Sequence, residues 1–239
     1  MVLPACSGYE SESEPEELVD ETDNSGEGDG DDSGDDSGDD SDDDSGDDSG
    51  DDSGDDSDAS GTINGYAYVD LGLSVKWATC NIGADSPEDY GNYYAWGETE
   101  TKSTYTSDNS VTYGVEMDDF SGDTEYDAAT ANWGSPWRMP TSSEIDELIS
   151  DCTWTWTTLN SVNGYEVTGT NGNSIFLPAA GYRNSSSLKF EGSNGYYWSS
   201  TPHTSDTKFA YCLCFYISNI YCSGGFYRYY GQSVRPVSE

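Results

Sequence analysis

A four-residue repeat of Asp, Ser and Gly fills the chain from Gly30 onward and contains no apolar residue before Ala59. A segment without apolar side chains cannot bury enough surface to offset the entropy that it would lose on folding. We therefore predict that residues 1–60 form a disordered acidic tether, which its own charge extends. The composition changes at Gly61, and the about 179 residues that remain suffice for one domain with a hydrophobic core, residues 61–239.

Net charge limits the partners of both parts. The chain has 47 acidic and 8 basic residues, and residues 1–60 hold 26 of the acidic residues and none of the basic ones. The remaining 21 acidic residues outnumber the 8 basic ones, so the second part is negative as well. Nucleic acids and anionic lipid headgroups are bound through clustered Lys and Arg. Nucleic acid is therefore not expected as a partner.

The first residues carry a motif for covalent lipid attachment. The run Leu3-Pro4-Ala5-Cys6, followed by acidic residues, resembles the lipobox and the surface-export signal of Bacteroidetes lipoproteins. The resemblance implies that Cys6 is lipidated, that the protein is an outer-membrane lipoprotein, and that the repeat holds the domain away from the cell surface. One alternative stays open, in which Cys6 is an ordinary exposed thiol of a cytoplasmic protein.

Short runs of β-branched and aromatic residues, separated by Gly, Asn and Ser, predict strands in the second part. The predicted strands are residues 66–71, 75–80, 92–96, 174–177 and 210–217. Few helices accompany them, so the fold class is α+β with many short strands and loops.

One helix is clearly predicted. Thr141 is followed three residues later by Glu144, which is the pattern of a capping box. An apolar stripe at helical spacing follows, formed by Ile145, Leu148, Ile149 and Cys152. A weaker pattern predicts a second helix within residues 123–132.

Several sequence motifs, in the order in which they occur along the chain, resemble those of a known bacterial family. They are GYAYVDLGLSVKWATCNIG, ATANWGSPWRMPTSSEIDELI, NGNSIFLPAAGYRN, GYYWSS and GQSVRPV. They are similar to the Fibrobacter succinogenes major paralogous domain, and WRMPT also resembles formylglycine-generating-enzyme-like domains. The resemblance implies a C-type lectin-like fold.

Bacterial proteins of that fold include targets of diversity-generating retroelements, whose C-terminal segment is rewritten by adenine-directed mutation. Residues 209–227 contain only residue types that adenine-directed mutation of pyrimidine-ending codons can supply. The resemblance therefore implies a variable protein.

The C-terminal segment is the predicted ligand-binding surface. Read as a strand, it directs Tyr211, Leu213, Phe215 and Ile217 inward and displays the residues between them. A turn is expected at Ser218-Asn219 and a loop at residues 223–225. Tyr, Ser, Gly and Asn dominate antibody paratopes, because Tyr gives large contact area at low entropy cost. The predicted ligand-binding residues are Cys212, Cys214, Tyr216, Asn219, Tyr221, Cys222, Phe226, Tyr227, Tyr229 and Tyr230.

These residues favour a non-enzymatic domain that binds an extracellular protein or glycan. One alternative is a structural or adhesive surface lipoprotein of fixed specificity, in which the rings are core. The other is a formylglycine-generating-like or carbohydrate-active enzyme. The single histidine, His203, lies in a predicted exposed loop and completes no catalytic constellation. We therefore assign no catalytic residue, no metal ligand and no cofactor.

The cysteines leave two alternatives open. Cys80 and Cys152 form either a disulfide, as in an exported protein, or two inert buried thiols. Cys212, Cys214 and Cys222 are expected to be unpaired thiols, with a three-thiol metal site as the alternative.

Several tryptophans and arginines lie within or beside the sequence segments that resemble the bacterial family, and we expect them to have structural roles. These are Trp77, Trp133, Trp137 and Trp198, which we expect in the core, and Arg138, Arg183 and Arg235, which we expect to bond to loop carbonyls or carboxylates.

Overall fold

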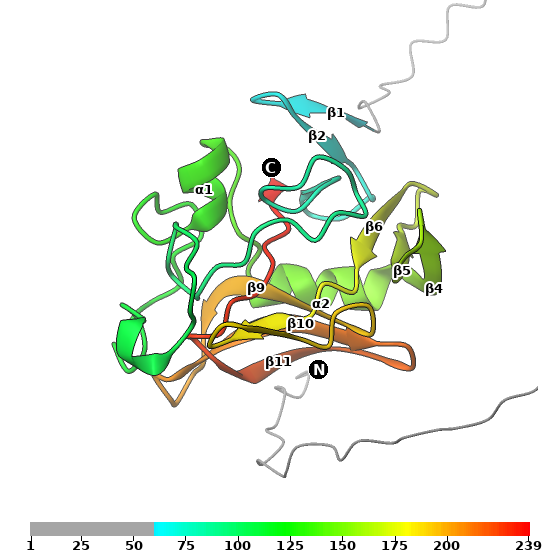
Figure 1. The fold of residues 1–239 in the computed structure, drawn as a ribbon. Helices are drawn as coiled ribbons and strands as arrows, with labels where there is room; N and C mark the ends of the chain where they lie inside the picture. The colour runs from blue at the N-terminus through cyan, green and yellow to red at the C-terminus, as the bar shows by residue number, and fades with distance from the viewer. Residues whose placement is uncertain (1–59) are drawn as a thin grey trace, which may run out of the picture. The chain divides into compact units, whose positions relative to one another are not determined.

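The computed structural model describes residues 60–239 (Figure 1). The predicted tether and the predicted lipidation site at Cys6 lie outside the described residues. Within residues 60–239, no helix is long and apolar enough to cross a membrane.

The described chain is an α+β domain made mostly of antiparallel strands, which confirms the predicted class. The elements are β1 (Ser60–Ile63), β2 (Tyr66–Val69), β3 (Lys76–Ala78), a 3-10 turn (Ser107–Asn109), α1 (Ala128–Trp133), α2 (Ser142–Asp151), β4 (Thr153–Leu159), β5 (Val162–Thr168), β6 (Ser174–Pro178), β7 (Tyr182–Asn184), β8 (Ser187–Lys189), β9 (Asn194–Pro202), β10 (Phe209–Tyr216), β11 (Asn219–Tyr227) and β12 (Val237–Ser238). Four sheets form, with strand orders β1-β2-β3-β12, β11-β10-β9, β4-β5-β6 and β7-β8.

Four of the five predicted strands form, and the prediction for residues 92–96 is wrong. That segment makes only one isolated bridge, between Tyr94 and Gln232. Its backbone N–H groups donate to the irregular segment that follows β11, since Tyr94 bonds to the carbonyl of Gln232 (2.9 Å) and Trp96 bonds to that of Arg228 (2.8 Å). A run of strand-forming residues therefore becomes a buried irregular segment, because no single strand lies beside it.

Helix α2 confirms the predicted capping box. The hydroxyl of Thr141 accepts from the N–H of Glu144 (3.3 Å), and the Glu144 carboxylate accepts from the N–H of Thr141 (2.8 Å). Ile145 and Leu148 are buried, as the apolar stripe requires. The second helix begins later than predicted. Its cap is Asp127, whose carboxylate accepts from two N–H groups of the first turn (2.8 and 3.0 Å).

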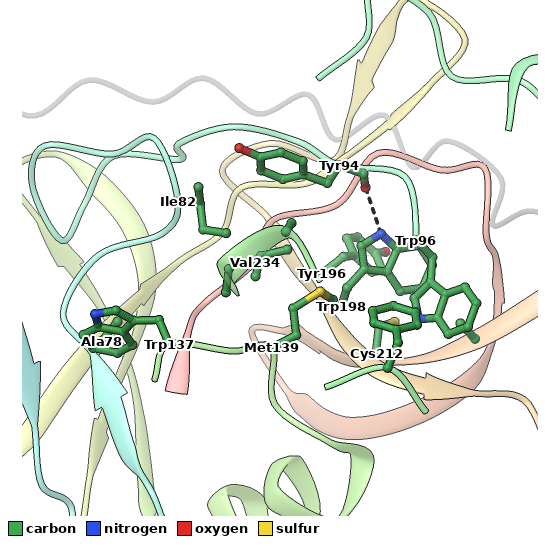
Figure 2. Close-up of a cluster of buried hydrophobic side chains, with 14 of the residues drawn as sticks. Ala78, Ile82, Tyr94, Trp96, Trp137, Met139, Tyr196, Trp198, Cys212 and Val234 are labelled. Atoms are coloured by element: carbon green, nitrogen blue, oxygen red, sulfur yellow. Dashed lines mark hydrogen bonds between the residues drawn. The ribbon is translucent and has the colours of Figure 1, made fainter. Parts of the chain in front are cut away.

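The sheet β9-β10-β11 lies between two hydrophobic clusters. One face packs against α2 and includes Leu213 and Phe215. The other face contacts a second cluster, in which Trp96, Trp198 and Cys212 lie together (Figure 2). The indole N–H of Trp198 donates to the carbonyl of Tyr94 there (2.9 Å). The core positions predicted for four tryptophans are confirmed for Trp77, Trp133, Trp137 and Trp198.

Buried Arg235 and the half-buried Arg138 and Arg183 tie loops to this core. Arg235 donates to the side chain of Asn81 (2.9 Å) and to the carbonyl of Phe176 (3.0 Å). Arg138 forms a bidentate pair with Glu144 (2.9 and 2.6 Å). Arg183 lies over the ring of Tyr93, 4.9 Å from its centroid. The structural roles predicted for Arg138 and Arg235 are confirmed, because a guanidinium bonds several acceptors from one fixed plane.

Candidate functional site

The predicted binding segment folds as a β-hairpin. Strands β10 and β11 pair from Tyr216 opposite Asn219 to Phe209 opposite Tyr227. The turn is Ile217-Ser218, one residue earlier than predicted. The loop predicted at residues 223–225 is wrong as well, because these residues continue β11.

The expectation that Cys212 and Cys214 are displayed is wrong. Their exposed fractions are 0% and 1%, and Leu213 and Phe215 between and beside them are buried too. Strand β10 is the middle strand, and a cluster of side chains covers each face of its sheet. The alternation of residue types along β10 therefore does not predict which of its side chains are buried. Ile217, predicted to point inward, lies in the exposed turn.

The cysteines do not form the three-thiol site. The sulfurs of Cys212 and Cys214 lie 3.1 Å apart on one face of the sheet. Cys222 pairs with Leu213 and packs against the opposite cluster. Among residues 60–239, no group of three or more His, Cys, Asp or Glu side chains is placed to hold a metal ion. Burial raises the pKa of Cys214, so this thiol is neutral at physiological pH.

The disulfide alternative for Cys80 and Cys152 is also not observed. Both are free, half-buried thiols. Burial raises the pKa of Cys152 to about 11, which makes it a poor nucleophile at neutral pH.

A continuous run of half-buried rings lies at the end of the β10-β11 hairpin that is away from its turn. We call it the aromatic row; in order of contact it consists of Tyr211, His203, Phe209, Tyr227, Tyr229 and Tyr113. Phe209 and Tyr227 stack with their ring centroids 4.5 Å apart, and Tyr227 and Tyr229 stack at 5.2 Å. None of the six side chains is fully buried, so together they form one aromatic surface.

A side branch extends this surface. Tyr230 lies 4.9 Å from Tyr229 and 4.9 Å from Tyr182, measured between ring centroids. Tyr182 in turn contacts Phe190, which is 47% exposed, at 6.1 Å. Burial raises the pKa of Tyr229 and of Tyr230, so both phenols stay protonated at neutral pH and can donate hydrogen bonds.

A β-bulge makes room for the row. Strand β11 advances three residues, from Ser223 to Phe226, where β10 advances two. A β-carbon at Gly224 would lie 2.8 Å from the ring of His203 and 2.9 Å from that of Tyr211. A side chain at this position would therefore displace the two rings, because they lie directly on the backbone of β11.

Arg228 fixes the backbone beneath the row. Its buried guanidinium donates to the carbonyls of Phe209 (2.9 Å), Thr112 (3.1 Å) and Val115 (2.7 Å), and it lies 4.1 Å from the ring centroid of Trp96. Burial lowers the pKa of Arg228 to about 10, so the group is still charged at neutral pH. One side chain thus joins the loop that carries Tyr113 to the two strands that carry the other tyrosines.

His203 is not the freely exposed loop residue that we expected. Its Nδ1 accepts from the backbone N–H groups of Ser205 (3.3 Å) and Asp206 (3.1 Å), and its ring stacks on Tyr211. An accepting Nδ1 leaves the proton of the neutral ring on Nε2, which is the nitrogen that can donate to a ligand.

The structure divides the predicted site residues into separate groups. Tyr227 and Tyr229 belong to the aromatic row, and Tyr230 and Phe226 lie beside it. Tyr216, Asn219 and Tyr221 lie around the hairpin turn, at the other end of β11, where Asn219 donates to the hydroxyl of Tyr216 (3.4 Å). Nine residues of strand span about 27 Å, so the two ends are separate surfaces.

Sequence reasoning missed four residues of the row, Tyr113, His203, Phe209 and Tyr211, and the buried Arg228 beneath it. Tyr211, predicted to point inward, is half-buried and lies in the row. The long loop of Tyr113 and the loop of His203 gave no periodic signal, and contacts between distant segments place both side chains. Arg228 had one available signal, which is a cation inside a run of aromatic residues.

Cavities lie elsewhere. Two cavities of about 400 and 430 Å³ share Val111 and Tyr126 in their linings, and a third of about 340 Å³ lies on the outer face of β4 to β6. No residue of the aromatic row lines any of these three.

The fold and this surface define a small α+β domain with an open aromatic surface at one end of its central hairpin. A domain family of unknown function, DUF8237, matches residues 140–237. That span begins just before α2 and ends in β12, so it includes both three-stranded sheets. No curated protein and no solved structure matches the chain.

Proposed function

We propose that the folded domain is a non-enzymatic binding module that recognises a protein or glycan outside the cell through the aromatic row. The observation that carries this proposal is the contact of six half-buried rings in one run. Aromatic side chains supply large apolar area with a polar tip, so they are enriched where a protein contacts its partner. Apolar patches of this kind are otherwise uncommon on a monomer.

The framework of the proposal is the resemblance to the Fibrobacter succinogenes major paralogous domain. Under it, the domain has a C-type lectin-like fold, Cys6 carries a lipid, and the acidic repeat extends the domain from the outer membrane. Retroelement-driven diversification of residues 209–227 belongs to the same proposal. Its test is a neighbouring, imperfect DNA copy of this segment that differs almost only at adenines, beside a reverse transcriptase gene. The lack of such a copy would leave a module of fixed specificity.

Binding to intact bacterial cells and to immobilised polysaccharides tests the function. The purified full chain is compared with Tyr227→Ala and Tyr229→Ala, which remove neighbouring rings of the row. Loss of a central aromatic contact weakens binding roughly tenfold or more. The matched control is Tyr221→Ala, because Tyr221 is a half-exposed tyrosine of the same strand at the far end.

The outcomes separate the alternatives. Weaker binding by the two row variants, with the control unchanged, supports the proposal. Treating the target cells with protease or with periodate then shows whether the ligand is protein or glycan. Row variants that bind like the parent protein overturn the proposal, and row variants that only lose stability indicate that these rings are structural.

A further inference from the structure

Strand β4 forms an open edge of the sheet β4-β5-β6. It pairs with β5 from Thr153 opposite Thr168 to Leu159 opposite Val162, without any register shift. Figure 1 draws β4 at the rim of this sheet, with β5 inside it. Among the described residues, no backbone hydrogen bond joins residues 153–159 to any segment other than β5. The opposite edge is covered, because Arg235 donates to the carbonyl of Phe176 in β6.

The hairpin turn determines which groups of β4 point outward. Asn160 and Ser161 form a two-residue turn with φ of 47° and 69°, which makes Leu159 and Val162 a hydrogen-bonded pair. Such pairs alternate along an antiparallel ladder. The N–H and C=O groups of Trp154, Trp156 and Thr158 therefore point away from β5.

The sequence of this edge is a palindrome. Residues 153–157 read Thr-Trp-Thr-Trp-Thr, symmetric about Thr155. An antiparallel pair of two such strands around a two-fold axis at Thr155 places Trp154 opposite Trp156 of the second copy. It also places the outward N–H and C=O groups of those two residues opposite each other, so every donor meets an acceptor.

The composition of the edge favours such pairing. Exposed edge strands of monomers usually carry a charge, a proline or a bulge that prevents association. Residues 153–159 have no charged residue and no proline, and every member is Thr, Trp or Leu, types that favour strands. No charge would be buried unpaired, so the electrostatic cost of joining two edges is small.

We propose that two copies of this chain associate through β4, in the register centred on Thr155, to form a continuous six-stranded antiparallel sheet. Each Trp154 then contacts Trp156 of the second copy on one face, and the threonines pair on the other face. The contact is smaller than a standard interface of about 1,600 Å², which predicts a reversible dimer. Because both copies are acidic, screening of their repulsion makes the dimer stronger at higher salt.

Sedimentation of the full chain tests the association. At about 100 µM protein and about 0.5 M NaCl, we expect a species of twice the 25.9 kDa chain mass. Thr155→Glu places two like charges opposite each other at the two-fold axis, with Glu166 of each copy beside them, and we expect it to weaken the dimer roughly tenfold or more. The matched control is Thr168→Glu on the adjacent strand, away from the edge, which leaves the dimer intact. A monomer under these conditions, or equal effects of the two variants, overturns the proposal.

Disulfide trapping tests the register independently. In a Cys6→Ser background, Thr155→Cys places two thiols directly opposite each other in a non-hydrogen-bonded pair, where side chains lie closest. Oxidised glutathione should cross-link this variant into a dimer. Thr153→Cys is the control, because its partner position is residue 157 of the second copy, so its own copy lies too far away. Cross-linking of both variants to the same extent, or of neither, contradicts the register.

Discussion

The two three-stranded sheets of this domain differ in how many of their faces are covered. In β9-β10-β11, side chains cover both faces, and Cys212 to Phe215 are all buried in sequence. In β4-β5-β6, the outer face is open along β4 and at Glu166 of β5, whereas Ile175, Phe176 and Leu177 of β6 are all buried. The alternation of residue types therefore reports burial at the β4 edge of the second sheet, and it does not do so in β6 or in β10.

The difference arises from what packs on each sheet. Helix α2 contacts β9, β10 and β11 on one face, and loops that carry Trp96 and Trp137 supply the other face. The chain enters β4 directly after α2, and only the face of β4 with Trp154 and Trp156 reaches the core. On the other face, Thr153 and Thr155 are exposed and Thr157 is half-buried.

The largest expected effect lies where the two sheets meet. Phe215 of β10 contacts Tyr165 of β5 (5.2 Å between centroids) and Tyr197 of β9 (5.9 Å). Phe215→Ala should lower the free energy of unfolding by about 3–5 kcal/mol, because it leaves a cavity between the sheets. Urea denaturation measures this loss. Phe190→Ala is the control, since Phe190 is about half exposed and should cost about 1 kcal/mol or less. Equal losses would show that Phe215 does not join the sheets.

Cys214 tests directly whether β10 is covered on both faces. The sequence predicts that Cys214 is displayed, and a displayed side chain contributes little to stability, but the buried position reverses that expectation. Cys214→Ser should lower the free energy of unfolding by about 1–3 kcal/mol, because it buries a hydroxyl without a prepared partner. Thermal or urea unfolding measures the change. Cys80→Ser, at a half-buried position, should lower the free energy of unfolding by less. A Cys214 variant as stable as the parent protein would show that β10 is not covered on both faces.

Helix α2 depends on the ion pair at its start, and this dependence varies with pH. Burial by itself raises the pKa of Glu144, but bonds from Arg138 and from the N–H of Thr141 outweigh it and leave the pKa lowered. A lowered folded-state pKa gives stability that is present above the unfolded pKa of about 4.3 and is lost as pH falls through the folded value. Glu144→Gln should therefore cost about 1–2 kcal/mol at pH 7.

Urea unfolding at several pH values checks this window. The stability difference between the parent protein and Glu144→Gln should be constant above about pH 5 and shrink below about pH 4. Asp146→Asn on the same helix is the control and should show no loss at pH 7, because burial raises the pKa of Asp146. A difference that does not change with pH would argue against the ion pair.

The smallest effect is expected on the open face. Thr155 is exposed and lies opposite Glu166 in β5. Thr155→Ala should change the free energy of unfolding by no more than about 0.5 kcal/mol in dilute solution, where copies are separate. A loss as large as that of Cys214→Ser would mean that this face is covered too, and the comparison between the sheets would fail.

Local chemistry sufficed for several elements. The capping box and apolar stripe predicted α2, and runs of β-branched and aromatic residues predicted β6 and β10. The bulge at Gly224 and the start of α1 at Asp127 were not predicted, because each depends on a contact with a segment elsewhere or on a side chain with several roles.

The candidate site shows the same division. The sequence identified Tyr227, Tyr229 and Tyr230 because the segment is rich in aromatic residues. It could not place Tyr113 or His203 beside them, because long loops bring these residues in, and it misplaced Cys212 and Cys214.

The sequence by itself determined the α+β class, helix α2 and the aromatic character of the C-terminal hairpin, because propensity, capping and composition act between near neighbours. Only the tertiary structure decided that β10 is covered on both faces and that six rings from four segments meet in one row. The burial of both faces of a strand and the meeting of rings from separate segments depend on which distant parts of the chain pack there. The residue pattern of the strand itself does not predict this.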